Sequence, residues 1–299
     1  MGTEHVPRGG DLMGAWRLLT CFAHPDDEAF IGGGILAMST AQGAEVRLVC
    51  ATYGEAGDIR TPGSAIPETL AEVRYEELRH SCRVLGIPEP VMLGYRDSGW
   101  GDDPAQRHPN ALVNAPDREV MQSLVAAIRR FKPHVVLTFE PAGLSGHKDH
   151  IAISKHATFA YQLAGDISVF PEQSQEGLAP WRPQRLLYVA RPKGHRLDRA
   201  RRLWQAGIDT PLPPREQWEI GVPLEQLHLI LDVGPYLDTK LSSIRCHRTQ
   251  VPPDWAYLQV PADVTQAIHG KEYLIQADPP LAEGEQMSSD LFAGLTADA

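Results

Sequence analysis

The chain has 299 residues, 42% of them hydrophobic, which is enough for one large α/β domain or two modest ones. Its formal net charge is −10 and its basic residues never run beyond a pair, which argues against a nucleic-acid surface. Four widely spaced cysteines without a C-x-x-C pair are typical of a reducing, cytoplasmic setting. The sequence shows no signal peptide and no apolar run that could span a bilayer, so we expect a cytoplasmic protein that acts away from membranes.

Strand and helix patterns alternate over the first half of the chain. Short apolar runs at residues 17–22, 45–51, 91–93 and 134–139 predict strands, and longer periodic segments at 28–42, 68–85, 117–131 and 147–164 predict helices. Strands that alternate with helices of this length predict an α/β fold with a mostly parallel sheet and right-handed crossovers.

The pattern becomes more irregular after residue 165. Strands are expected at 185–190 and 227–233 and a last helix at 234–248, while the long polar loop 95–116 has the composition of a functional loop. The basic and proline-rich stretch 192–223 is expected to shape access to a site. We expect a single domain over residues 15–276, with 165–276 shaping the pocket and flexible tails at 1–14 and 277–299.

Two polar clusters follow two of the apolar runs. His24-Pro25-Asp26-Asp27-Glu28 comes directly after the first predicted strand, and Gly146-His147-Lys148-Asp149-His150 follows the fourth. Acidic residues are rarely buried unless they are paired or bound to metal, and ligands of open α/β sheets bind at the carboxyl ends of strands. The two clusters therefore predict one shared metal site.

The donor types favour a hydrolytic zinc site, in which three protein ligands leave the fourth position to water. His24, Asp27, His147 and His150 give four candidates for three places, and spacing alone does not decide between the last two. Asp26 is then free to act as the general base. We interpret His147 as the histidine that stabilises the oxyanion, with Asp149 nearby to orient it. Iron can occupy the same ligand set, so the native metal stays open.

Less specific features receive ordinary structural explanations. The run Gly32-Gly33-Gly34 lacks the G-x-G-x-x-G spacing of a dinucleotide site, and close packing of a helix explains it better. A nucleotide-binding module is therefore disfavoured. A non-catalytic metal- or sugar-binding protein is a second rival, although binding alone needs no base such as Asp26 beside the metal.

The two clusters resemble the signatures of the PIG-L-like (LmbE-like) zinc-dependent N-deacetylases, which include enzymes of bacillithiol and mycothiol metabolism and mycothiol-conjugate amidase. Further segments that carry the resemblance are 52–57, 74–78, 93–99 and 246–250, so that it covers about residues 17–250.

The resemblance implies a Rossmann-like fold, with one zinc ion held by His24, Asp27 and His150. It also implies that Asp26 is the base, that His147 stabilises the oxyanion or protonates the leaving amine, and that Asp149 supports the ligands. Positions that would contact the sugar or line the pocket are Asp58, Arg74, Asp97 and His247. For the first three the alternative is an exposed charge or a helix ion pair, and His247 could instead cap the last helix.

Two departures from the family pattern stand out. Ser145 stands where mycothiol-precursor deacetylases have a tyrosine that assists the oxyanion, so that assistance is in doubt. Lys148 replaces the usual proline, which should alter only the exposed side of the turn.

The function we predict is removal of an N-acetyl group from an N-acetylglucosamine-type conjugate, with a soluble amino-sugar conjugate as the partner. The alternative within the same chemistry is an amidase that cleaves a thiol S-conjugate. The sequence leaves the aglycone and the oligomeric state open.

Overall fold

The fold is built on a seven-stranded sheet. The computed structural model of the protein describes residues 16–282 and 284–297. The strands are β1 (Arg17–Phe22), β2 (Glu45–Thr52), β3 (Val91–Tyr95), β4 (Val135–Phe139), β5 (Arg185–Ala190), β6 (Leu229–Asp232) and β7 (Lys271–Asp278). They are ordered β3-β2-β1-β4-β5-β7-β6, with β1 to β5 parallel and β7 antiparallel to both of its neighbours.

The strand order reverses beside β1. From β1 the chain moves to β2 and β3 on one side, then returns to place β4 and β5 on the other. Leu18 consequently pairs with Val46 of β2 and with Val135 of β4. Ligands of open α/β sheets bind where the order reverses, outside the carboxyl ends of the strands. The two polar clusters follow β1 and β4, the two strands that flank this point.

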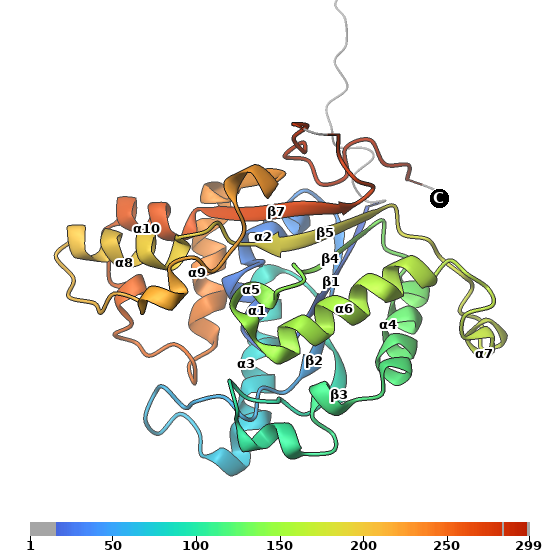
Figure 1. Ribbon diagram of the computed structural model, residues 1–299, viewed down its shortest axis with the longest axis horizontal. Coiled ribbons are helices and arrows are strands. Elements are labelled where there is room, and N and C mark those ends of the chain that lie inside the picture. Colours follow the sequence, from blue (N-terminus) through green and yellow to red (C-terminus); the bar gives the residue numbers. More distant parts are fainter. Residues whose placement is uncertain (1–15, 283, 298–299) are drawn as a thin grey trace, which may run out of the picture.

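Helices cover both faces of the sheet (Figure 1). On one face α2 (Gly33–Ala41), α3 (Leu70–Leu85) and α9 (Leu237–Cys246) pack together, and on the other α4 (Asp117–Phe131) packs against α6 (Lys148–Leu163). The remaining helices are α1 (Asp27–Phe30), α5 (Gly143–Gly146), α7 (Pro171–Gln175), α8 (His195–Gln205) and α10 (Ala262–His269). The α/β prediction of a mostly parallel sheet flanked by helices is confirmed.

The predicted helix 28–42 is two helices, α1 and α2, separated at Ile31 and Gly32. The glycines here serve close packing, although the contact is to the turn before α9 rather than to the centre of the sheet. A Cβ atom on Gly34 would lie 2.5 Å from the side chain of Val233, so only glycine lets α2 approach this closely. The backbone N–H groups of Gly34 and Ile35 donate to the carboxylate of Glu272 at 2.8 Å each. A protein carboxylate thus occupies the helix N-terminus that binds phosphate in nucleotide-binding relatives of this fold.

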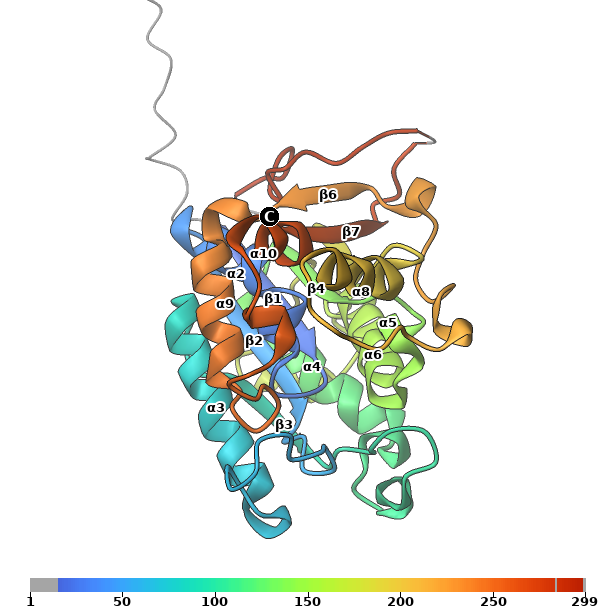
Figure 2. The ribbon, with the colours of Figure 1, turned by 90° about the vertical axis from the view of Figure 1, so that its left-hand side faces the viewer.

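The region after residue 250 is more regular than its sequence suggests. Strand β7 lies between β5 and β6 in the sheet, and Figure 2 shows it beside β6. It was not predicted because its buried face carries polar residues. Glu272 and Gln276 are both buried, which hides the usual alternation of apolar and polar side chains. The segment from residue 277 was expected to be a flexible tail, but β7 continues to Asp278, and Leu291 and Phe292 are buried.

Phe292 stacks on Trp16 at a ring distance of 5.4 Å, which fastens this last segment to the start of β1. The tail expected at residues 1–14 lies outside the described residues. Among the helices that the structure describes, none combines the length and the apolar character needed to cross a bilayer.

Candidate metal centre

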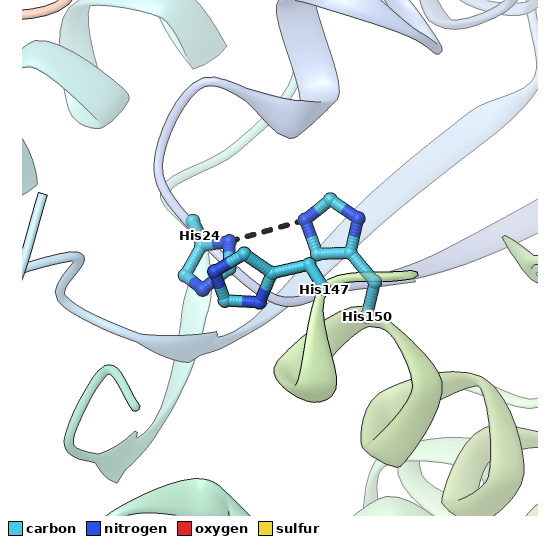
Figure 3. Close-up of side chains that lie close together, drawn as sticks. All are labelled: His24, His147 and His150. Carbon is cyan, nitrogen blue, oxygen red and sulfur yellow. Dashed lines mark hydrogen bonds between the residues drawn. The ribbon is translucent and has the colours of Figure 1, made fainter. Parts of the chain in front are cut away.

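The two polar clusters meet at the carboxyl ends of β1 and β4. His24 and Asp27 lie in the turn from β1 into α1, and His147 and His150 lie at the start of α6. Figure 3 shows the three imidazoles side by side, with His147 and His150 reaching toward His24 from the other chain segment. Segments more than 120 residues apart in sequence thus form one site, as in the contact between His24 and His150.

Three donor groups converge at distances that suit a tetrahedral cation. His24 Nδ1 and His150 Nε2 are 3.2 Å apart, and the carboxylate oxygens of Asp27 lie 3.6 Å from the first and 3.3 Å from the second. Donors about 2.0–2.1 Å from a tetrahedral zinc ion lie about 3.3 Å from one another. The three groups therefore match one face of a zinc coordination shell.

The ring nitrogens of His24 and His150 that point away from the proposed metal position fix the tautomers that such a shell requires. His24 Nε2 lies 3.2 Å from Asp149 Oδ2 and donates its proton there, while His150 Nδ1 lies 3.2 Å from the carbonyl oxygen of Gly143. Each ring therefore turns a lone pair toward the other, and Asp27 adds a negative charge between them. Metal-binding histidines commonly donate their second N–H in this way. The arrangement leaves space for a cation.

His147 has the opposite tautomer. It is the N-cap of α6, and its Nδ1 accepts the backbone N–H of Asp149 at 3.2 Å. A neutral ring in this tautomer carries its proton on Nε2, so that atom donates a hydrogen bond and offers no lone pair. Burial lowers the pKa of His147, which favours the neutral form. Nε2–H is thus available to an oxygen in the cavity, whereas Ser145 is not among the described residues that line it.

Two other groupings of donors fit a catalytic metal less well, the first because His147 in the tautomer described above offers no lone pair to the cavity and the second because it is less open. One nitrogen each of His24, His147 and His150 fall within 4.8 Å of one another, as do donor atoms of His24, Asp97, His147 and Asp149. The Asp149 carboxylate is fully buried and accepts the N–H and the Oγ–H of Ser98 at 2.8 and 2.5 Å. A catalytic metal needs one position open to solvent. His24, Asp27 and His150 all line the cavity, which Asp149 does not.

Asp149 therefore supports His24 rather than His147, which differs from the expected pairing. Asp97 Oδ1 lies 3.4 Å from the same His24 nitrogen and also accepts the N–H of Gly99 at 2.8 Å. Burial alone would lower the pKa of His24, but the negative charges of Asp97, Asp149 and Asp27 outweigh it and raise the pKa. This acidic surrounding strongly favours positive charge at the centre of the site.

Asp26 lies beside the donor set in an unusual backbone conformation. Its φ of 114° is in the region that favours glycine, and its backbone N–H is held by Glu28 Oε2 at 3.0 Å. Arg74 donates to Asp26 Oδ2 at 3.1 Å and to the carbonyl oxygen of Pro25. Burial raises the pKa of Asp26 to about 6, against the opposing positive charge of Arg74. A carboxylate with this pKa can take up a proton near neutral pH.

The segment after β2 makes room for Arg74. The guanidinium donates to the carbonyl oxygen of Gly54 at 2.6 Å, and a Cβ atom on Gly54 would lie 2.2 Å from it. Gly54 also has a φ of +69°, which other residues adopt only with strain. The motif at 52–57 therefore serves to seat the arginine that holds Asp26.

A cavity of about 550 Å³ opens over this centre. Three predicted sugar contacts, Asp58, Arg74 and Asp97, line it, but Arg74 is buried and occupied with Asp26. His247 does not line the cavity. It is fully buried, and its Nε2 contacts Glu28 Oε1 at 2.6 Å.

The His247–Glu28 pair forms the buried support beneath Asp26. Burial opposes the charged form of both groups, but each partner outweighs it, which raises the pKa of His247 and lowers that of Glu28. Glu28 also accepts the Ser81 hydroxyl. Since the same carboxylate holds the Asp26 backbone, His247 acts on the site through Glu28.

Several cavity residues were not identified from the sequence. They are Arg60, Trp100, Asp103, Arg196, Gln217 and Gln250. Trp100 could have been suspected from the sequence, since it is a large apolar residue in the long polar loop 95–116. In the structure it is 57% exposed. Its ring lies 5.3 Å from that of His147. Arg196 and Gln217 come from the irregular stretch 192–223 and bond to each other at 2.6 Å, so this stretch does form a wall of the cavity.

Comparison with known proteins defines the class of this chain as a deacetylase. It is 33% identical over 286 residues to a 1D-myo-inositol 2-acetamido-2-deoxy-alpha-D-glucopyranoside deacetylase of Nocardiopsis dassonvillei, covering 91% of this chain and 99% of the relative. The enzyme of the same name from Thermomonospora curvata is 32% identical over 307 residues, with 93% and 97% covered. The family model described as GlcNAc-PI de-N-acetylase matches residues 19–161. The chain belongs to the PIG-L family.

Solved structures agree in fold. N,N'-diacetylchitobiose deacetylase from Pyrococcus horikoshii superimposes with a TM-score of 0.62 at 20% identity, covering 89% of this chain and 87% of that one. The 4-carboxy-2-hydroxymuconate hydratase GalB from Pseudomonas putida gives 0.59 at 18% identity, covering 91% and 100%. Because a hydratase shares the fold, the fold alone does not define the reaction.

Proposed function

We propose that the protein is a zinc-dependent hydrolase that removes the N-acetyl group from an N-acetylglucosamine-type conjugate. The observation that carries the proposal is the convergence of His24 Nδ1, His150 Nε2 and the Asp27 carboxylate within 3.2–3.6 Å at the base of an open cavity. The relatives are named for a 2-acetamido-2-deoxy-glucopyranoside of inositol, which supports an amino-sugar conjugate as the substrate class.

In this proposal His24, Asp27 and His150 hold the metal ion. A zinc ion held by these residues would lower the pKa of a bound water toward about 7 and would polarise the amide carbonyl. The acidic surroundings of His24 favour a cation, and the two outer N–H bonds, to Asp149 and to the Gly143 carbonyl, keep both rings in the ligating tautomer.

Asp26 is the proposed general base. Its carboxylate lies next to the donor set, and Arg74 binds one of its oxygens, which leaves the other free to accept a proton from the attacking water. The His147 Nε2–H is proposed to donate a hydrogen bond to the carbonyl oxygen as negative charge develops on it. The amine that departs takes up a proton, and protonated Asp26 is the group with a suitable pKa to supply it.

The sugar is proposed to lie against Asp58 and Asp97, with Trp100 offering an apolar face. Arg74 and His247 are proposed to position Asp26, directly and through Glu28. The four free cysteines are consistent with the proposed cytoplasmic setting.

The test combines metal analysis with an amine-release assay. Purified protein is treated with chelator, reloaded with zinc or iron(II), and assayed on the inositol glycoside of N-acetylglucosamine and on free N-acetylglucosamine. We expect one metal ion per chain, loss of activity on chelation, and faster release of amine from the glycoside. Full activity in metal-free protein would refute the proposal.

A further inference from the structure

A second, smaller cavity of about 30 Å³ lies near the metal centre, and its lining includes four cationic side chains: Arg191, Arg199, Lys240 and Lys271. Arg191 follows β5 and Arg199 belongs to α8. His195 of α8 and His269 of α10 also line it, but burial lowers the pKa of both, so they are neutral. Helices α8 and α10 lie side by side in both views (Figures 1 and 2). In a chain with a net charge of −10, such a concentration of positive charge requires a physical explanation.

The charges of this cavity are not balanced by the protein. Among the described residues that line it, Glu272 is the one carboxylate, and it is already occupied. It accepts Lys240 Nζ at 2.8 Å and the backbone N–H groups that begin α2. The positive charges of Arg191 and Arg199 therefore have no acidic partner among the described residues.

The two guanidinium groups also lack hydrogen-bond acceptors. Arg199 Nε and Nη2 are buried without a partner in the described part of the chain, and the guanidinium stacks on Tyr257 at 4.2 Å. Arg191 has neither a side-chain hydrogen bond nor an ion pair to any described residue. Burial, followed by the charges of Arg199 and Arg196, lowers the pKa of Arg191 to about 10. The two buried Arg199 donors left without acceptors are costly, and the like charge of Arg191 adds to that cost.

We propose that this cavity binds a carboxylate group between the guanidinium groups of Arg191 and Arg199. A planar guanidinium donates two parallel hydrogen bonds to a carboxylate, and a bound anion would offset both the unmet donors and the repulsion. The size agrees with a carboxylate group of one carbon and two oxygens, because a water needs about 10–15 Å³ of such space and the cavity of about 30 Å³ therefore holds about two to three groups of that size.

Two kinds of ligand could carry the carboxylate into this cavity. It arrives as a free ion, such as the acetate that the proposed reaction releases, or it is carried by the aglycone of the substrate. The second source rests on the proposed function, and it is supported by Arg196, which lines the metal cavity from the same helix that carries Arg199. Phe30 and Ile31, at the end of the short helix that begins at Asp27, line the small cavity, so the two cavities are neighbours.

The first experiment measures acetate binding to the zinc-loaded protein by titration calorimetry at constant ionic strength. Wild type is compared with Arg199→Met, which keeps the apolar stem, and with Arg191→Met. Arg202→Met is the matched control, because Arg202 lies on the same helix but is only partly buried and pairs with Asp198 at 2.7 Å. We expect the two cavity variants to lose at least tenfold in affinity at one acetate site and the control to lose none. Circular dichroism and the Tm verify that each variant is folded. If one of the two cavity variants is unfolded, the other alone is enough to test the acetate site.

The second experiment compares kcat/KM on the malate and inositol glycosides of N-acetylglucosamine. A loss of tenfold or more in Arg199→Met on the malate glycoside alone assigns the carboxylate to the substrate. Loss of acetate binding with equal effects on both glycosides assigns the site to a free ion. The proposal is overturned if wild type shows no acetate site that depends on Arg199 or Arg191 and Arg199→Met shows no selective loss on the malate glycoside. If wild type cleaves neither glycoside, the proposed function fails, and the calorimetry still decides the carboxylate site.

Discussion

Replacing Asp26 by asparagine tests the proposed division between metal ligands and general base. Asparagine has the same shape, and its carbonyl oxygen can still accept from Arg74, which lies 3.1 Å from Asp26 Oδ2 in the structure. The change removes the negative charge and, with it, the ability to take up a proton. General base catalysis contributes about 10²–10⁴-fold, so we expect kcat to fall by that factor, which is about 3–5 kcal/mol in the barrier.

The assay measures amine release and zinc content on the same preparation of Asp26→Asn. Zinc should stay at the wild-type ratio, because the three converging donors belong to other residues. Loss of zinc would make Asp26 a ligand, and kcat within threefold of wild type would exclude it as the base. Either result refutes the reasoning.

The pH profile gives the same carboxylate a second test. Asp26 must be deprotonated to act as a base, and burial raises its pKa to about 6, so kcat/KM should fall as the pH drops through that region or, with a bound cation, somewhat below it. The positive charge of Arg74 lowers this pKa. In Arg74→Met the acidic limb should therefore move to higher pH, and a limb that stays in place or moves to lower pH would contradict the assignment.

Three further predictions concern the neighbouring residues. Asp27→Ala and His150→Ala should each strip zinc from the protein, measured by elemental analysis after dialysis; an unchanged metal ratio in either variant contradicts its role as ligand. His147→Ala should lower kcat by about 10²-fold or more with little change in KM, as expected for an interaction made in the transition state, and a rise in KM alone would make it a binding residue. Gly54→Ala should lower both Tm and kcat, because its Cβ would meet Arg74 at a φ of +69°, whereas Gly63→Ala, at +77° with open space, should lower Tm slightly and leave kcat unchanged.

The position of the candidate site could be predicted from the sequence because two local patterns were sufficient. Each polar cluster directly follows an apolar strand, and the strand ends of a parallel sheet meet at one edge, so His24 and His150 were expected to approach each other. The choice between His147 and His150 could not be made in this way. It depends on which ring nitrogen meets the Gly143 carbonyl and which meets a backbone N–H, and three-residue spacing does not determine that.

The parts that the sequence did not reveal depend on long-range partners. Asp149 was expected beside His147, but the fold brings Ser98 and His24 to its carboxylate instead. Strand β7 was not predicted because it contains the buried carboxylate of Glu272. This carboxylate accepts backbone N–H groups of α2, more than 230 residues earlier in the chain. A periodicity analysis treats such a residue as exposed.

The contact between Glu272 and α2 has a consequence for the order in which the chain acquires its working form. All proposed metal ligands have been synthesised by residue 150. The last strand, β7, is synthesised much later, inserts between β5 and β6, and supplies the Glu272 carboxylate that accepts the first N–H groups of α2. A nascent chain would hold an incomplete sheet until β7 had been synthesised. Truncation near residue 270 would therefore leave a protein with its proposed metal ligands present but its sheet unfinished.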